Sequence, residues 1–87
     1  MKVIFIERSW LDYLWFQANN KQLLNKINDL IKEIKRTPFT TGIGKPESLK
    51  MNLSGYWSRR INSEHRIVYE VSEDAIIIIS CRFHYTK

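Results

Sequence analysis

The sequence has few of the residues that mark an extracellular, membrane-spanning or disordered protein. One cysteine among 87 residues excludes a disulfide within the chain, which is consistent with a reducing compartment. No apolar stretch approaches the roughly 20 residues that a membrane helix needs. The first residues are typical of a strand and not of a signal peptide. Three glycines and two prolines leave most of the chain to regular structure. We therefore expect one soluble, cytoplasmic domain over residues 1–87.

Acidic residues are also scarce relative to basic ones. Fourteen lysines and arginines stand against nine aspartates and glutamates, which gives a net charge of +5. On so small a surface this excess favours an anionic partner such as nucleic acid, a membrane face or an acidic protein. The alternative is a charge that only keeps the protein soluble. The 44% hydrophobic content argues against disorder and predicts a folded core.

The first half of the chain predicts a strand followed by two helices. Residues 2–7 form an apolar run typical of a strand buried on both faces. Ser9 and Asp12 fit a capping box that would begin a short aromatic helix. Residues 21–36 carry apolar side chains at three- and four-residue spacing, which predicts a second helix. Pro38 ends it, because the residue before a proline avoids helical geometry.

The second half predicts three antiparallel strands near residues 56–61, 65–71 and 75–83, joined by three-residue polar turns. With the first strand and the two helices, this order predicts an α+β sandwich of the order β-α-α-β-β-β. Both helices should cover one face of a mostly antiparallel sheet. In this register Val71 lies opposite Ala75, and the odd-numbered residues up to Phe83 form the core face.

Two arginines are expected to lie side by side on the even-numbered face. The register puts Arg60 directly across from Arg66. Like charges in such a pair destabilise a sheet by about 0.2–1 kcal/mol. A phosphate held between the two guanidinium groups would compensate for the repulsion. The alternative is that both side chains extend into water.

The segment GIGKPESLK, residues 42–50, is the main loop of the chain. It has neither the spacing of a Walker phosphate loop nor the strand and helix context of a dinucleotide motif. Its acid, Glu47, follows Pro46 and lies between Lys45 and Lys50. A carboxylate between cations is favoured in its charged form, as a general base requires. An ordinary exposed acid is the alternative.

A second candidate pair, His84 and Tyr85, lies near the end of the sequence. A histidine exchanges a proton near neutral pH, and a tyrosine stacks on a nucleic-acid base. Together with Glu47 and the arginines, these residues suggest RNA cleavage without a metal. The acid would take the proton of a ribose 2′-hydroxyl, an arginine would stabilise the added charge, and the histidine would protonate the leaving 5′-oxygen.

Several segments resemble the YoeB (Txe) toxins of the RelE superfamily: SW..Y, INDLIKEIKRTPF, GIGKPESLK, NLSGYWSRRINSEHRIVYEV and CRFHY. The resemblance covers residues 2–85. It implies a bacterial toxin of a type II toxin–antitoxin pair that binds the ribosomal A site and cuts mRNA there, with no metal or cofactor. Two departures are Ser48, where the family often has a proline, and the two residues after Tyr85.

The resemblance also implies a role for each candidate. Glu47 corresponds to the general base, His84 to the general acid and Arg66 to the arginine that stabilises the transition state. Tyr85 corresponds to the tyrosine that positions the substrate. The cationic positions expected to contact RNA are Lys45, Lys50, Arg60 and Arg82.

The family implies two protein partners as well. One is a YefM-like antitoxin whose disordered segment folds over the toxin. The other is a second copy of the chain, for which the aromatic region from Trp10 to Tyr13 is a candidate surface. Two other functions stay open. A ParE-type toxin would bind gyrase and lack the nuclease residues, and a non-catalytic RNA-binding module would need neither Glu47 nor His84.

Overall fold

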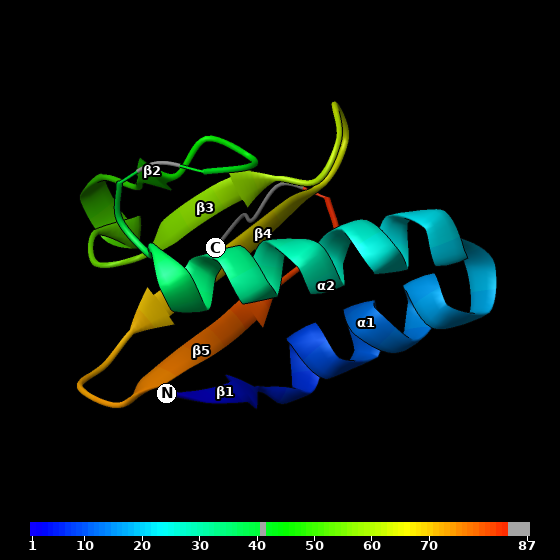
Figure 1. The fold of residues 1–87 in the computed structure, drawn as a ribbon, viewed down its shortest axis with the longest axis horizontal. Helices are drawn as coiled ribbons and strands as arrows, with labels where there is room; N and C mark the ends of the chain where they lie inside the picture. The colour runs from blue at the N-terminus through cyan, green and yellow to red at the C-terminus, as the bar shows by residue number, and fades with distance from the viewer. Residues whose placement is uncertain (41, 84–87) are drawn as a thin grey trace.

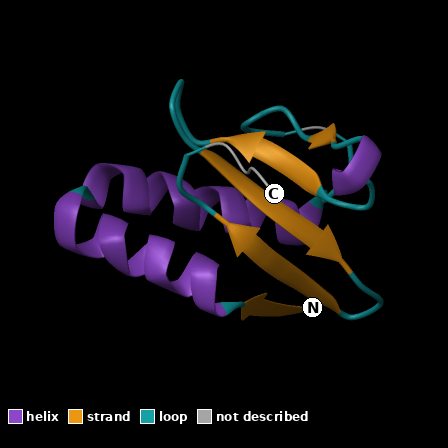
Figure 2. Cartoon of the chain, turned by 180° about the vertical axis from the view of Figure 1, so that it is seen from behind, coloured by secondary structure: helices purple, strands orange, loops and turns teal. Residues whose placement is uncertain are grey.

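The computed structural model describes residues 1–40 and 42–83, and shows two helices on one face of a five-stranded sheet (Figures 1 and 2). The elements are β1 (Lys2–Phe5), α1 (Glu7–Asn19), α2 (Lys21–Arg36), β2 (Glu47–Ser48), a 3₁₀ turn (Met51–Leu53), β3 (Trp57–Arg60), β4 (Arg66–Val71) and β5 (Ala75–Ser80). The strand order is β1-β5-β4-β3-β2, and only the β1–β5 pair is parallel. The predicted α+β sandwich is confirmed, and the short edge strand β2 is an addition.

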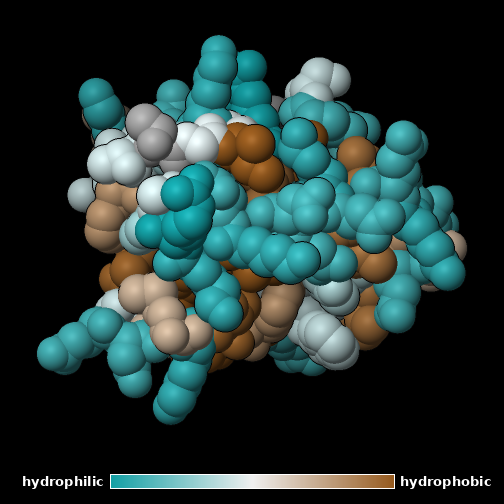
Figure 3. Space-filling view, viewed as in Figure 1, coloured by the Kyte–Doolittle hydropathy of each residue, from teal (hydrophilic) through white to brown (hydrophobic). Residues whose placement is uncertain are grey.

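Helix α2 forms as its apolar periodicity predicts. Ile27, Leu30 and Ile34 are fully buried against the sheet. The Asn20 side chain caps the start by accepting a hydrogen bond from the backbone N–H of Leu23 (3.1 Å). In Figure 3 hydrophilic side chains dominate the opposite, outward side of this layer. Within residues 1–40 and 42–83, neither helix combines the length and apolar character needed to cross a membrane.

Helix α1 begins earlier than the capping-box pattern predicts. It starts at Glu7, with Ile6 at the N-cap position and Ser9 inside the first turn. The fully buried Ser9 hydroxyl accepts a hydrogen bond from Ile6 N–H (3.0 Å) and donates one to the Ile78 carbonyl (2.6 Å). The prediction that Ser9 is the N-cap was wrong because the helix starts two residues before it. Ser9 is the third helical residue, where its hydroxyl still accepts from the N-cap residue and also fastens α1 to β5.

Strand β1 is an edge strand, so the prediction that it is buried on both faces was wrong. Val3 and Phe5 pack against the core, while Ile4 between them is 42% exposed. An apolar run fits a strand in the middle of a sheet and also a strand at its edge, so the sequence does not distinguish the two positions. Within the described part of the chain β1 pairs with β5 alone, which makes it an edge strand.

The register of β5 differs by one residue from the prediction. Val71 pairs with Ile76 and not with Ala75, and Tyr69 pairs with Ile78. The core face therefore carries odd-numbered residues on β3 and β4 but even-numbered ones on β5. The pairing of β4 with β5 also has an irregularity between Val68 and Tyr69, where the register shifts. The strand also ends at Ser80, so Phe83, expected on the core face, is 47% exposed.

The chain just after β5 is tied back to α1. The backbone N–H of Cys81 donates to the Asp12 carboxylate (3.1 Å), and the Cys81 sulfur lies 3.7 Å from the Ser9 carbonyl oxygen. Burial, with a smaller contribution from the Asp12 charge, raises the pKa of the Cys81 thiol to about 12. The thiol is therefore a protonated packing group and not a nucleophile.

Candidate active site

The acid and the arginine predicted from separate segments meet on the sheet face opposite the helices. Glu47 on β2 pairs directly with Ser58 on β3. Arg66 on β4 donates a hydrogen bond from Nη1 to Ser58 Oγ (3.1 Å), and the same nitrogen lies 3.6 Å from Glu47 Oε1. The Glu47 side chain is 63% exposed and that of Arg66 is 19% exposed. The carboxylate is thus open to a substrate, while the arginine is held in place.

The predicted pairing of Arg60 with Arg66 is confirmed. Arg60 is exposed, whereas Arg66 extends across the sheet towards Glu47. A carboxylate therefore offsets part of the Arg66 charge, and the pair of like charges costs less than the register alone suggests.

Two hollows flank this ion pair. The first, which we call the basic hollow, has a volume of about 570 Å³ and is lined by Lys26, Gly44, Lys45, Arg60, Ile61, Asn62, Ser63 and Arg66. The second has a volume of about 480 Å³ and is lined by Glu47, Ser48, Leu49 and Lys50. Arg66 belongs to the first and Glu47 to the second, so the ion pair joins them. Lys26 was not predicted, because an exposed lysine on a helix carries no sequence signal.

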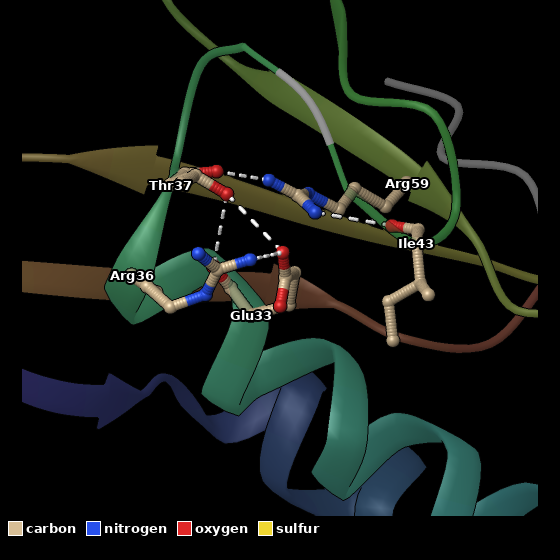
Figure 4. A network of polar contacts seen from close by, with 5 residues as sticks. All are labelled: Glu33, Arg36, Thr37, Ile43 and Arg59. Atoms are coloured by element: carbon tan, nitrogen blue, oxygen red, sulfur yellow. Dashed lines mark hydrogen bonds and ion pairs between the residues drawn. The ribbon is translucent and has the colours of Figure 1, made fainter.

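Arg59, an odd-numbered residue that the predicted register puts on the core face, organises the loop that leads to Glu47 (Figure 4). Its side chain is fully buried and donates to the carbonyl oxygens of Thr37 and Ile43 (3.0 Å for Ile43). Arg59 Nε also donates to the Tyr69 hydroxyl (3.3 Å), which in turn donates to the Pro38 carbonyl (2.6 Å). One guanidinium group therefore holds the loop at its start, just after α2, and again at Ile43.

Two ionisable groups, Tyr69 and Glu33, lie near Arg59 and the start of the loop. Burial raises the pKa of Tyr69, although the hydrogen bond from Arg59 acts in the opposite direction. The hydroxyl therefore stays protonated and can donate. At the end of α2, a hydrogen bond from Arg36 to Glu33 (2.5 Å) is the main reason that the pKa of Glu33 is lowered. Figure 4 shows Glu33 and Arg36 beside Thr37, beneath the Arg59 side chain.

Gly44 brings the loop against β3. A Cβ atom there would lie 2.9 Å from the Arg59 Cβ, the Arg60 carbonyl oxygen and a Leu30 methyl carbon. Its φ of +83° is also one that side chains disfavour. The close approach lets the Arg60 N–H donate to the Gly44 carbonyl (2.8 Å). Glu47 follows three residues later, so its placement depends on this contact.

Comparison with known proteins places this arrangement in a family. The model of the YoeB-like toxin of bacterial type II toxin–antitoxin systems matches residues 5–85. The chain belongs to the YoeB toxin family. It is 67% identical, over the full length of both chains, to Toxin YoeB of Synechocystis sp.. The predicted family and the RelE-like fold are thereby confirmed.

Two solved structures from Staphylococcus aureus show the same fold with partners. A YoeB dimer superposes with a TM-score of 0.90 at 50% identity, and a YoeB–YefM complex superposes with a TM-score of 0.89 at 52% identity. Each match covers 98% of this chain and 98% of the other.

In this YoeB-family chain His84 and Tyr85 lie outside the described residues, but the residue before them is firmly held. The Phe83 N–H donates to His65 Nδ1 (2.8 Å), and the Arg66 N–H donates to the Phe83 carbonyl (3.2 Å). Glu64 Oε1 lies 3.3 Å from His65 Nε2, which favours the proton on that nitrogen and leaves Nδ1 as the acceptor. His65 thus connects the chain before His84 to the strand that carries Arg66.

His65→Phe is expected to release this connection. Phenylalanine keeps the ring contacts with Phe16 and Phe83 (centroids 5.1 and 5.2 Å) but lacks the acceptor. The Phe83 N–H is only partly buried, so the loss of its acceptor should cost about 1 kcal/mol, the lower end of the range for unpaired groups. The Phe83 amide should therefore exchange about fivefold faster. His65→Asn supplies an acceptor and loses the ring contacts. It should lower the free energy of unfolding while keeping the Phe83 amide protected. Equal protection in wild type and His65→Phe would contradict the prediction.

Arg82 differs from the other predicted RNA-contacting cations. Its guanidinium carbon lies 3.7 Å from the centre of the Trp15 ring, a cation–π contact with α1. In the described part of the chain it lines neither hollow, and its role in RNA contact stays a prediction. The described residues also hold no group of three His, Cys, Asp or Glu side chains arranged to bind a metal ion.

Proposed function

We propose that this YoeB-family toxin is a ribosome-dependent endoribonuclease that cuts mRNA in the ribosomal A site and so inhibits translation. The observation that carries the proposal is the 3.6 Å contact between Arg66, which lines the basic hollow, and the exposed Glu47 carboxylate, which lines the second hollow with Lys50. A substrate phosphate placed beside Arg66 would be within reach of a base, as cleavage of RNA requires.

In the proposed reaction Glu47 takes the proton of a ribose 2′-hydroxyl. The 2′-oxygen then attacks the adjacent phosphorus, and the bond from phosphorus to the 5′-oxygen breaks. Arg66 stabilises the negative charge that builds up on the phosphate oxygens. His84 gives a proton to the leaving 5′-oxygen, and Tyr85 positions the substrate. This sequence needs neither a metal nor a cofactor.

We propose two protein partners for the toxin in the cytoplasm. The YoeB–YefM complex from Staphylococcus aureus supports a YefM-like antitoxin for this chain. The YoeB dimer from the same organism supports a homodimer. A candidate surface for the second copy is the aromatic pair of Trp10, which is 47% exposed, and Tyr13, whose ring stacks on it at 5.9 Å. Phe5 packs edge-on against both rings.

Primer extension on an mRNA under translation tests the proposed activity. Purified toxin should produce new cuts in mRNA on bacterial ribosomes and far fewer in the same mRNA without ribosomes. Adding a YefM-like antitoxin should abolish the cuts. If a folded, antitoxin-free protein makes no cuts, the nuclease proposal fails, and binding to gyrase becomes the next function to measure. Binding to mRNA without cleavage would instead favour a non-catalytic RNA-binding module.

A further inference from the structure

The basic hollow lies where three segments distant in sequence converge. Lys26 comes from the middle of α2, Gly44 and Lys45 from the loop before β2, and the remaining residues from the end of β3, its turn and the start of β4. Figure 1 shows these segments: α2, the loop before β2, and the turn that joins β3 to β4.

The charges around the basic hollow all have one sign. Four cationic side chains line it: Lys26, Lys45, Arg60 and Arg66. Among the described residues its lining includes no carboxylate. Cations gathered around one depression repel one another, and an anion in the depression relieves that repulsion. The grouping therefore favours an anionic ligand, independently of what Glu47 does.

The shape of the basic hollow fits an extended ligand and not a single small ion. A volume of about 570 Å³ falls in the range of 300–1,000 Å³ that is typical of organic ligand sites. The turn between β3 and β4, which lines one side of the hollow, is held by two hydrogen bonds: Asn62 Oδ1 accepts from the backbone N–H groups of Glu64 (2.9 Å) and His65 (2.7 Å). Arg66, which lines the hollow, also lies 3.6 Å from Glu47, so this arginine links the hollow to the proposed base.

We propose that Lys26 is a further phosphate contact of the RNA substrate, and that it extends the cationic surface expected at Lys45 and Arg60 across the basic hollow to the helix layer. This inference rests on the proposed RNA-cleaving function. Arginine and lysine are the residues that bind phosphate groups. Lys26 adds a cation from the helix layer to the cations of the sheet and loop. The RNA therefore runs from the hollow past Arg66 towards Glu47.

RNA explains the lining better than an acidic protein segment does. A folding peptide needs apolar pockets for its side chains. Among the described residues that line the hollow, Ile61 is the only large apolar one, and it is 5% exposed. A nucleic-acid backbone needs cations at intervals and little apolar area. An acidic peptide is therefore an alternative for the experiment to exclude.

Lys26→Gln tests the proposal, with Lys32→Gln as the matched control. Both lysines are exposed on α2, and only Lys26 lines the basic hollow. Glutamine has nearly the same helix propensity as lysine, so both variants should fold alike. Binding of a short 2′-O-methyl oligoribonucleotide, which cannot be cut, is measured by fluorescence anisotropy at several salt concentrations.

Lys26→Gln is expected to weaken binding by about three- to tenfold at low salt, and to lower the slope of log Kd against log salt by about 0.7, the value for one phosphate contact on single-stranded nucleic acid. Lys32→Gln should bind like wild type. Equal effects of both substitutions, or no binding by the wild-type protein at low salt, would overturn the proposal. So would a loss of affinity confined to an acidic antitoxin peptide.

The binding measurement separates this proposal from the nuclease itself. Lys26 takes no part in the proposed proton transfers, and the anisotropy measurement uses an RNA that cannot be cut, so it reports binding alone. If wild-type protein binds RNA through Lys26 but never cuts it, the basic hollow is retained and the nuclease proposal fails. If the protein cuts RNA and Lys26→Gln behaves like Lys32→Gln, the nuclease is retained and the inference about the hollow fails.

Discussion

Glu47→Gln is expected to slow RNA cleavage by about 100- to 10,000-fold, the usual contribution of a general base. The amide has nearly the shape of the carboxylate but cannot take the proton of the 2′-hydroxyl. The fold should be almost unaffected, because the side chain is 63% exposed and an exposed ion pair contributes at most about 1 kcal/mol. Single-turnover cleavage on translating ribosomes measures the rate, and urea denaturation checks the free energy of unfolding.

A matched acid provides the control for this loss. Glu73 is exposed in the turn between β4 and β5 and lines neither hollow, and Glu73→Gln removes the same charge. It should cut RNA at the wild-type rate. His84→Ala should lose about as much activity as Glu47→Gln, and the double variant little more, since residues that act as a unit are not additive. A Glu47→Gln protein within a few-fold of wild type would show that another group is the base.

Arg59→Met is expected to lower the free energy of unfolding by about 2–4 kcal/mol. It removes the Arg59 donor from the partly buried carbonyl oxygens of Thr37 and Ile43 and from the buried Tyr69 hydroxyl. A lost donor costs about 1–3 kcal/mol where the partner is buried. Removing a charge that is buried in the protein offsets part of this cost. For a domain of this size, 1 kcal/mol corresponds to about 4–8 °C in Tm. Thermal and urea denaturation should therefore both show a large shift.

The next residue along β3 is the natural control. Arg60 carries the same charge but is exposed, and Arg60→Met should change the free energy of unfolding by no more than about 0.5 kcal/mol. Arg59→Lys keeps the buried charge but cannot reach the three acceptors in the same way, so it should resemble Arg59→Met. Equal stability of the Arg59 and Arg60 variants would show that other contacts hold the loop.

Local chemistry determined much of this fold. The periodicity of residues 21–36 and the stop at Pro38 are decided within a few turns of chain, and α2 has the predicted bounds. The polar turn at residues 62–64 likewise sets the pairing of Arg60 with Arg66, because turn length fixes the register of a hairpin. Glu47, Arg66 and most of the cations around the two hollows could be predicted as site residues for the same reason, because residue type and spacing can be read from the sequence.

Only the tertiary structure decided how these elements meet. The edge position of β1 and the one-residue difference in β5 depend on which strands pair, and strand pairing joins residues far apart in sequence. The same holds for Arg59, whose buried contacts lie 10 to 22 residues away, and for Lys26, which joins the basic hollow from another layer. These neighbours are selected by how well their shapes pack and by the need to give buried polar groups hydrogen-bond partners. Both depend on residues far apart in sequence, so a local sequence pattern does not predict them.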